Sequence, residues 1–301
     1  MTDARSYAGY AAHPAHYGVA LPTSELWRTV LGLAAMVVLY LLLGIVYQQF
    51  LFLWAAGDFA ALETLETGST PQAMYWILFS FGLITAAVVF VTQTVHRRAG
   101  ISVLGRLDLL LPQMARVFVV LLVLMIALAV LPPYDMGGPL TPNMAPGLWA
   151  TLLPISLLAV FVQISAEEVL FRGFLQQQLA ARFSSPLIWM VVPSALFAIG
   201  HYQPSEAGSN ALLITLWAGM FGMLMADLTA RAGSLGPALV VHFLNNVVAM
   251  LITSVPDSLS GLALFLAPFG LGDEEALRAW LPVDFAMMVV FWLGARLALR
   301  R

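Results

Sequence analysis

Ionisable side chains stand inside three apolar stretches of this sequence, and their types are those that catalyse hydrolysis. Glu167, Glu168 and Arg172 lie in the first stretch. The second and third stretches carry Phe197-x-x-x-His201 and His242-x-x-x-Asn246. A charged side chain at the centre of a bilayer costs roughly 2.5 to 3.5 kcal/mol even on lenient scales, so such groups indicate function. The three stretches therefore define a candidate site.

The two glutamates of the first stretch are expected to do different work. Glu168 and Arg172 are four residues apart with the acid first, which is the favourable order for an ion pair on one helix face. Glu167 points about 100° away around the helix. It is therefore free to face a cavity and to act as a general base. The ion pair supports the helix beside it.

The other two stretches can bring imidazole and amide groups to the same point. Phe197 and His201 share one helix face, and so do His242 and Asn246. Counted along the helices from the cytoplasmic side, His242 lies about 9 Å deep and His201 about 21 Å deep. Straight, perpendicular helices would keep the two imidazoles apart, so tilt or a helix break is needed for them to meet.

This set of side chains fits hydrolysis of a peptide bond in two ways. Glu167, His201 and His242 can bind zinc and leave a coordination position open for water. Alternatively, Glu167 and His201 activate water without a metal, while His242 and Asn246 donate hydrogen bonds to the oxyanion. The HExxH signature of many zinc proteases is absent. Both schemes therefore stay open at this point.

Together the motifs Glu167-Glu168-x-x-x-Arg172, Phe197-x-x-x-His201 and His242-x-x-x-Asn246 resemble those of the CPBP intramembrane peptidases, also called the ABI family, which includes the type II CAAX prenyl endopeptidase. The resemblance covers roughly residues 148–255. It implies that Glu167 activates water, that His201 and His242 complete the catalytic centre, and that Asn246 helps to hold the oxyanion. It also implies supporting positions for Glu168 and Arg172, and either zinc or a metal-independent glutamate mechanism.

The composition requires a lipid environment. Hydrophobic residues make up 61% of the 301 residues and charged residues 10%, with a mean hydropathy of +0.89. An ordinary soluble domain is about 25% charged, so a soluble globular protein is excluded. The absence of cysteine removes thiol chemistry and disulfides. With no basic patch, nucleic acid is not an expected partner. The expected partners are the lipid bilayer and a peptide or membrane-protein substrate.

Apolar runs of about 20 residues predict transmembrane helices. The predicted fold is all-α, a polytopic membrane bundle of about eight transmembrane helices. Residues 259–271 form an apolar run that is too short to span with ease, and a re-entrant or interfacial position is expected for it. The eight predicted spans are 29–56, 74–95, 117–131, 148–183, 187–202, 211–230, 237–255 and 284–299.

The distribution of arginine orients this bundle. The chain has thirteen basic residues, all of them arginine, and cytoplasmic loops collect such residues. With both termini cytoplasmic, every arginine except Arg278 falls toward the cytoplasmic side. Residues 1–26 are expected to form a polar N-terminal segment and 27–301 a single membrane domain, with 148–255 as the catalytic core. Short loops and an arginine-only basic set favour the bacterial cytoplasmic membrane.

The sequence thus predicts a membrane-embedded endopeptidase, with two alternatives. Buried Glu, His and Arg side chains also build proton relays, which is typical of a proton-coupled transporter. A non-catalytic membrane scaffold or immunity protein could keep the same fold. The catalytic set predicted here is Glu167, His201, His242 and Asn246, supported by Glu168, Arg172 and Phe197.

Overall fold

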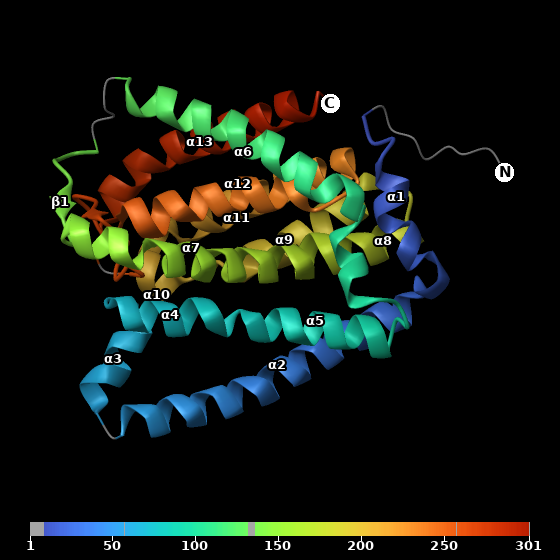
Figure 1. Cartoon of the computed structure of the whole chain (residues 1–301), viewed down its shortest axis with the longest axis horizontal. Coiled ribbons are helices and arrows are strands. Elements are labelled where there is room, and N and C mark those ends of the chain that lie inside the picture. The colour runs from blue at the N-terminus through green and yellow to red at the C-terminus, as the bar shows by residue number, and fades with distance from the viewer. Residues whose placement is uncertain (1–8, 57, 132–135, 257, 301) are drawn as a thin grey trace.

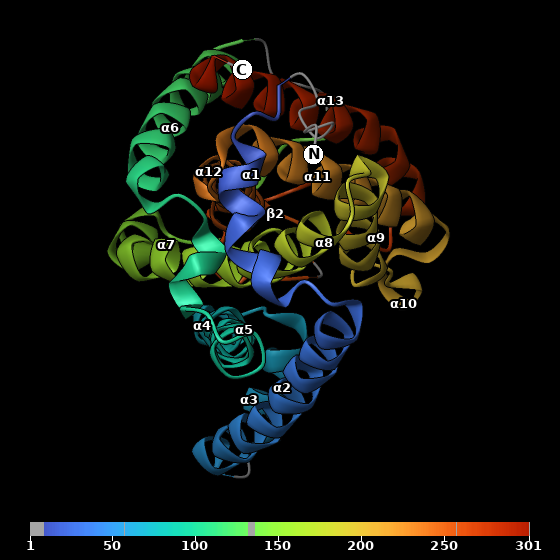
Figure 2. The same cartoon turned by 90° about the vertical axis from the view of Figure 1, so that its right-hand side faces the viewer.

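The computed structural model describes residues 9–56, 58–131, 136–256 and 258–300, and its long helices run side by side along one axis (Figure 1). Helices α7, α9, α11 and α12 lie in the middle of the bundle. Helices α6 and α13 cover one side, while α4, α5 and α2 lie on the other (Figure 2). The candidate core predicted from the sequence therefore lies between two flanking groups of helices.

The elements follow one another in a largely helical order. The α-helices are α1 (His13–Tyr17), α2 (Leu26–Ala55), α3 (Phe59–Thr67), α4 (Pro71–Ser80), α5 (Gly82–Thr94), α6 (Leu107–Ala129), α7 (Pro146–Glu168), α8 (Gln176–Arg182), α9 (Val192–Ile199), α10 (Pro204–Ala207), α11 (Ala211–Ala232), α12 (Gly236–Val247) and α13 (Glu274–Leu299). The 3₁₀ segments are η1 (Gly18–Thr23), η2 (Gly100–Leu104) and η5 (Gly208–Asn210), and the π-helical segments are η3 (Val169–Leu175), η4 (Leu187–Val191) and η6 (Val248–Ile252). The strands are β1 (Thr141–Pro142), β2 (Thr253–Ser254) and β3 (Phe265–Leu266).

The helical lengths make this an integral membrane protein. Among the described residues, six helices are long and apolar enough to cross a membrane, namely Leu26–Ala55, Pro71–Thr94, Leu107–Ala129, Pro146–Arg182, Pro204–Ala232 and Glu274–Leu299. Two shorter apolar helices, Leu187–Ile199 and Gly236–Ile252, occupy the positions of the fifth and seventh predicted spans. The predicted count of eight stays a prediction, as does the cytoplasmic position of both termini. Arg5 and Arg301, which contributed to that prediction, lie outside the described residues.

Two helices begin ten residues before the predicted spans, because those spans were read only from charge-free runs. Helix α6 begins at Leu107 rather than residue 117, and it includes Asp108 in its first turn. Helix α13 begins at Glu274 rather than residue 284, and the side chain of Asp273 caps it by accepting a hydrogen bond from the Ala276 N–H at 3.2 Å. Acidic side chains stabilise a helix N-terminus, so their presence there marks the start of a helix.

The apolar segment 259–271 folds as a non-helical cap over one end of the bundle. Strand β3 within it pairs with β1 and β2 in a small sheet of order β1-β3-β2. The amide of Asn143 donates to the carbonyls of Ser260 and Ala263 at 2.9 and 2.8 Å. At Gly261 the backbone passes so close to Thr70 that an added Cβ would lie 2.3 Å from the Thr70 carbonyl. The segment thus ties the ends of several helices together.

The orientation of the bundle can be measured because the chain has no cysteine of its own. Ala99 follows α5 at one end of the bundle and Ser205 lies in α10 at the other (Figure 1), and both are exposed. In intact bacteria, a membrane-impermeant maleimide is expected to label Ser205→Cys, and to label Ala99→Cys only after permeabilisation. The reverse pattern would contradict a cytoplasmic N-terminus.

Candidate active site

The first of the three predicted stretches lies where the helix that begins as α7 becomes π-helical. The helix from Pro146 to Arg182 is continuous, as the sequence predicted, but residues Val169–Leu175 are π-helical. The N–H of Gln176 bonds to the carbonyl of Phe171, five residues earlier. Such π segments concentrate at functional sites because they rotate the side chains on their two sides relative to one another. Here the π segment follows directly after the two glutamates.

Glu168 and Arg172 form the ion pair that their spacing predicted. Arg172 Nη1 donates to Glu168 Oε1 at 3.0 Å, and their side chains are 1% and 0% exposed. The Arg172 guanidinium also lies over the Phe197 ring, 4.8 Å from its centre. An unpaired charge at this depth would be strongly unfavourable, so each partner stabilises the other in the apolar interior.

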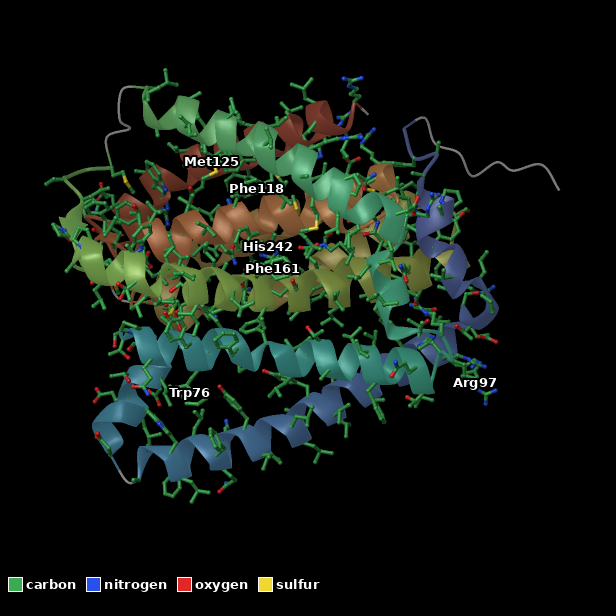
Figure 3. The ribbon with its side chains drawn as sticks, in the orientation of Figure 1. Trp76, Arg97, Phe118, Met125, Phe161 and His242 are labelled. Atoms are coloured by element: carbon green, nitrogen blue, oxygen red, sulfur yellow. The ribbon has the colours of Figure 1, made fainter. Side chains whose placement is uncertain are left out.

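Both glutamates contact the imidazole of His242, one at each ring nitrogen. His242 Nδ1 lies 2.8 Å from Glu168 Oε1, and His242 Nε2 lies 3.4 Å from Glu167 Oε2. Figure 3 places His242 near the middle of the length of the bundle. Because a carboxylate only accepts hydrogen bonds, Glu168 favours a proton on Nδ1 and leaves Nε2 facing Glu167. One imidazole therefore links a fully buried carboxylate to a second one that is 13% exposed.

Gln163 joins the site, although the sequence prediction did not include it. Its Nε2 donates to Glu167 Oε1 at 2.8 Å, and its Oε1 accepts a hydrogen bond from Asn246 Nδ2 at 2.8 Å. Gln163 thereby connects Glu167 with Asn246, which are on different helices. The usable signal was its position four residues before Glu167, which puts both on one helix face.

His201 packs against Phe197 from the turn that follows α9. Its Nδ1 is 2.8 Å from the carbonyl of Phe197, and the two rings are 4.4 Å apart. Phe197 also contacts the His242 ring, with 6.3 Å between ring centres. Helix α9 ends at Ile199, so His201 stands in the following turn. The depth difference between His201 and His242 that the sequence predicts stays a prediction.

The structure therefore gathers five of the seven predicted residues into one connected set and places the other two beside it. The connected set is Glu167, Glu168, Arg172, His242 and Asn246, with Gln163 added. Phe197 packs against this set, and His201 packs against Phe197.

The predicted zinc ligands fit only in part. Nitrogen and oxygen ligands about 2.0 to 2.2 Å from a tetrahedral zinc ion lie roughly 3.4 Å apart, a spacing that Glu167 Oε2 and His242 Nε2 match. The third predicted ligand, His201, has its Nδ1 2.8 Å from the carbonyl oxygen of Phe197 and its ring packed against that of Phe197. Across the part of the chain that the structure describes, no three His, Asp or Glu side chains are grouped to hold a metal ion. The residues present do not complete a three-ligand zinc centre.

Fold and site together define a helical integral membrane protein with an acid–base cluster buried in its core. Residues 149–248 match the family described as type II CAAX prenyl endopeptidase Rce1-like, which confirms the resemblance predicted from the motifs. The "Uncharacterized protein YyaK" of Bacillus subtilis (strain 168) is 32% identical over 114 residues, which are 36% of this chain. The chain thus covers 37% of the length of that relative. No solved structure matches.

The buried ion pair makes a prediction about stability. Replacing Arg172 by Met leaves the Glu168 carboxylate without its cation, which is expected to cost about 3 to 5 kcal/mol of unfolding free energy. The double variant Glu168→Gln with Arg172→Met removes both charges, so its loss should be much smaller than the sum of the two single losses. Unfolding in mixed micelles of increasing denaturing detergent measures each variant. Additive losses would contradict a direct interaction.

Proposed function

We propose that this protein is a membrane-embedded endopeptidase that hydrolyses a peptide bond with water activated by Glu167. The observation that carries the proposal is the contact of both glutamates with opposite nitrogens of His242. In this arrangement Glu168 is fully buried and contacts Arg172 and His242. The side chain of Glu167 is 13% exposed and can therefore contact water. The match of residues 149–248 to a family of prenyl endopeptidases supports the same chemistry.

The proposed reaction begins with proton transfer from water to Glu167. Gln163 donates to Glu167 Oε1 and so directs the other oxygen, Oε2, toward His242 and the water. As the water proton moves to Oε2, the water oxygen bonds to the carbonyl carbon of the peptide. Positioned general bases of this kind contribute about 10² to 10⁴ to a rate.

Asn246 is proposed to stabilise the oxyanion that this attack creates, and His242 is proposed to help transfer the proton to the leaving amine. The tetrahedral intermediate carries an oxyanion, for which the amide of Asn246 is the proposed donor. The carbon–nitrogen bond then breaks, and the proton held between Glu167 Oε2 and His242 Nε2 passes to the leaving amine. Glu168 keeps Nδ1 of His242 protonated throughout. Every proton taken from water is thus returned to a product.

His201 is proposed to contact the substrate from the turn that follows α9. Its Nδ1 is engaged by the Phe197 carbonyl, which leaves Nε2 as the nitrogen available to a bound peptide. The proposed substrate is a peptide or a membrane protein, approached from the cytoplasmic side of a bacterial cytoplasmic membrane. Each step uses a side chain of this protein, and zinc is not required by any of them.

Replacing the proposed base gives the direct test. Glu167→Gln keeps the shape of the side chain but cannot take a proton, so cleavage of a fluorogenic peptide library is expected to fall by about 10² to 10⁴. Folding should be unchanged, as judged by helicity and elution as a single species. Glu206→Gln, at an exposed glutamate in α10, is the matched control and should cleave like the wild type.

Two outcomes would overturn the proposal. Wild-type protein that cleaves nothing but drives proton-coupled flux in vesicles would be a transporter, and folded protein with neither activity would be a scaffold. Chelation in the same assay separates the two schemes of water activation. Activity should survive it, because both nitrogens of His242 already face carboxylates. Activity that is lost on chelation and restored by zinc would instead support a metal centre.

A further inference from the structure

The described part of the N-terminal segment, from residue 9 onward, lies across the end of the bundle at which the helix Pro146–Arg182 ends (Figure 2). Tyr10 donates its hydroxyl to Asp227 Oδ1 at 2.7 Å, and the Arg231 guanidinium lies over the Tyr10 ring at 5.0 Å. Asp227 pairs with Arg231 and also accepts a hydrogen bond from Trp292 at 2.9 Å. Tyr10 is thus held by Asp227 and Arg231 of α11, and Trp292 of α13 bonds to the same aspartate.

Two histidines of α1, the helix that follows Tyr10, are buried. His13 is 4% exposed and its ring lies 4.3 Å from that of Trp189. His16 is fully buried, and the two imidazoles stack with 6.2 Å between their centres. His13 makes aromatic contacts, whereas His16 also makes hydrogen bonds to the helix that carries the glutamates.

His16 reaches the backbone of the π-helical turn. Its Nε2 lies 3.1 Å from the carbonyl oxygen of Arg172, and its Nδ1 lies 3.5 Å from Gln177 Nε2. A carbonyl only accepts and the Gln177 amide nitrogen only donates, so the neutral imidazole carries its proton on Nε2. Gly105 leaves room for the ring, since an added Cβ there would lie 2.5 Å from His16 Nδ1.

The carbonyl that His16 holds lies in the part of the helix where the hydrogen-bond register changes. In a regular α-helix the N–H of Gln176 would bond to the Arg172 carbonyl. In this protein that N–H bonds to Phe171 instead. The Arg172 carbonyl therefore lacks the N–H donor that it would have in an α-helix, and His16 Nε2 donates to it instead. Arg172 is also the residue whose side chain fixes Glu168, and Glu168 fixes His242.

We propose that His16 is a positioning residue for the active site: its hydrogen bond to the Arg172 carbonyl fixes the π-helical turn and so aligns Glu168 and His242. The role of the N-terminal segment is then to hold this imidazole in place. This inference rests on the proposed peptidase function for its effect on rate, while its effect on the helix can be measured separately.

The protonation of His16 gives the proposal a pH dependence. Burial lowers the pKa of His16 to about 4, the Arg172 carbonyl opposes that shift, and the Arg98 guanidinium adds to it. The groups that face the ring are His13 on its own helix, Arg98, the Gln177 amide and the Arg172 carbonyl. Protonation would turn Nδ1 into a donor opposite the Gln177 amide. Because the pKa of His16 in the folded protein is about 4, the alignment is intact near neutral pH and is lost as pH falls through about 4. The unfolded chain takes up this proton at its ordinary pKa of 6.5, so the stability that neutral His16 contributes falls as pH drops from 6.5 to about 4.

The test compares two substitutions at His16 with one at His13. His16→Gln keeps a nitrogen donor for the Arg172 carbonyl and cannot be protonated, whereas His16→Leu has a similar size and no donor. At pH 7.5, His16→Leu is expected to lower kcat at least tenfold with KM unchanged, and His16→Gln to stay within about threefold of the wild type. His13→Phe keeps the aromatic packing against Trp189 and is the matched control, with wild-type kcat.

Two further measurements make the result decisive. As the pH falls from 5.5 to about 4, the ratio of kcat for His16→Gln to kcat for the wild type should rise, and this ratio decides the case if His16→Leu does not fold. Hydrogen exchange of the amides in residues 169–177 should be faster in His16→Leu than in His16→Gln, whether or not a cleaved peptide is known. Equal exchange, or equal kcat for the two variants at neutral pH, would overturn the proposal. If exchange is faster in His16→Leu but the wild-type protein cleaves no peptide, the role of His16 in fixing the helix stands and the proposed peptidase function fails.

Discussion

The rest of this structure depends on charge balance inside an apolar bundle. Two carboxylates, one guanidinium and one imidazole are in contact at a place where water cannot solvate them fully. With Glu167, Glu168 and Arg172 all charged, the set carries one net negative charge. The proton that Glu167 takes from water in the proposed reaction brings that charge to zero. Because Glu168 and Arg172 neutralise each other, Glu167 is the group whose charge the proposed acid–base chemistry changes.

The surrounding helices hold these groups at hydrogen-bonding distances. The π-helical turn after Glu168 sets the direction of Arg172, and Gly173 allows this turn to approach the backbone of Val103, where an added Cβ would lie 2.8 Å from the carbonyl oxygen. The N-terminal segment closes one end of the bundle through His16, and the small sheet around Phe265 closes the other. Segments outside the long helices therefore fix the positions of helices whose own contacts in lipid would be mainly apolar.

Periodicity and charge cost were enough to predict part of this site. Glu168 and Arg172 could be paired from the sequence because both lie on one helix, where spacing fixes geometry. The contact of His242 with both glutamates could not be predicted, because it depends on how α12 packs against α7. Gln163 was missed because an uncharged amide in an apolar run is a weak signal. His16 was missed since its segment is polar in composition and is buried only by tertiary contacts.

The central claim is that Glu167 activates water rather than attacking the peptide itself. A single turnover in water enriched in oxygen-18, on a peptide that the protein cleaves, tests this claim most directly. Mass spectrometry of both products and of the digested protein locates the heavy oxygen. The account predicts one solvent oxygen in the new carboxyl group of the peptide and none in Glu167. Label in the Glu167 carboxyl group, with an unlabelled peptide in the first turnover, would show a covalent intermediate and contradict the account.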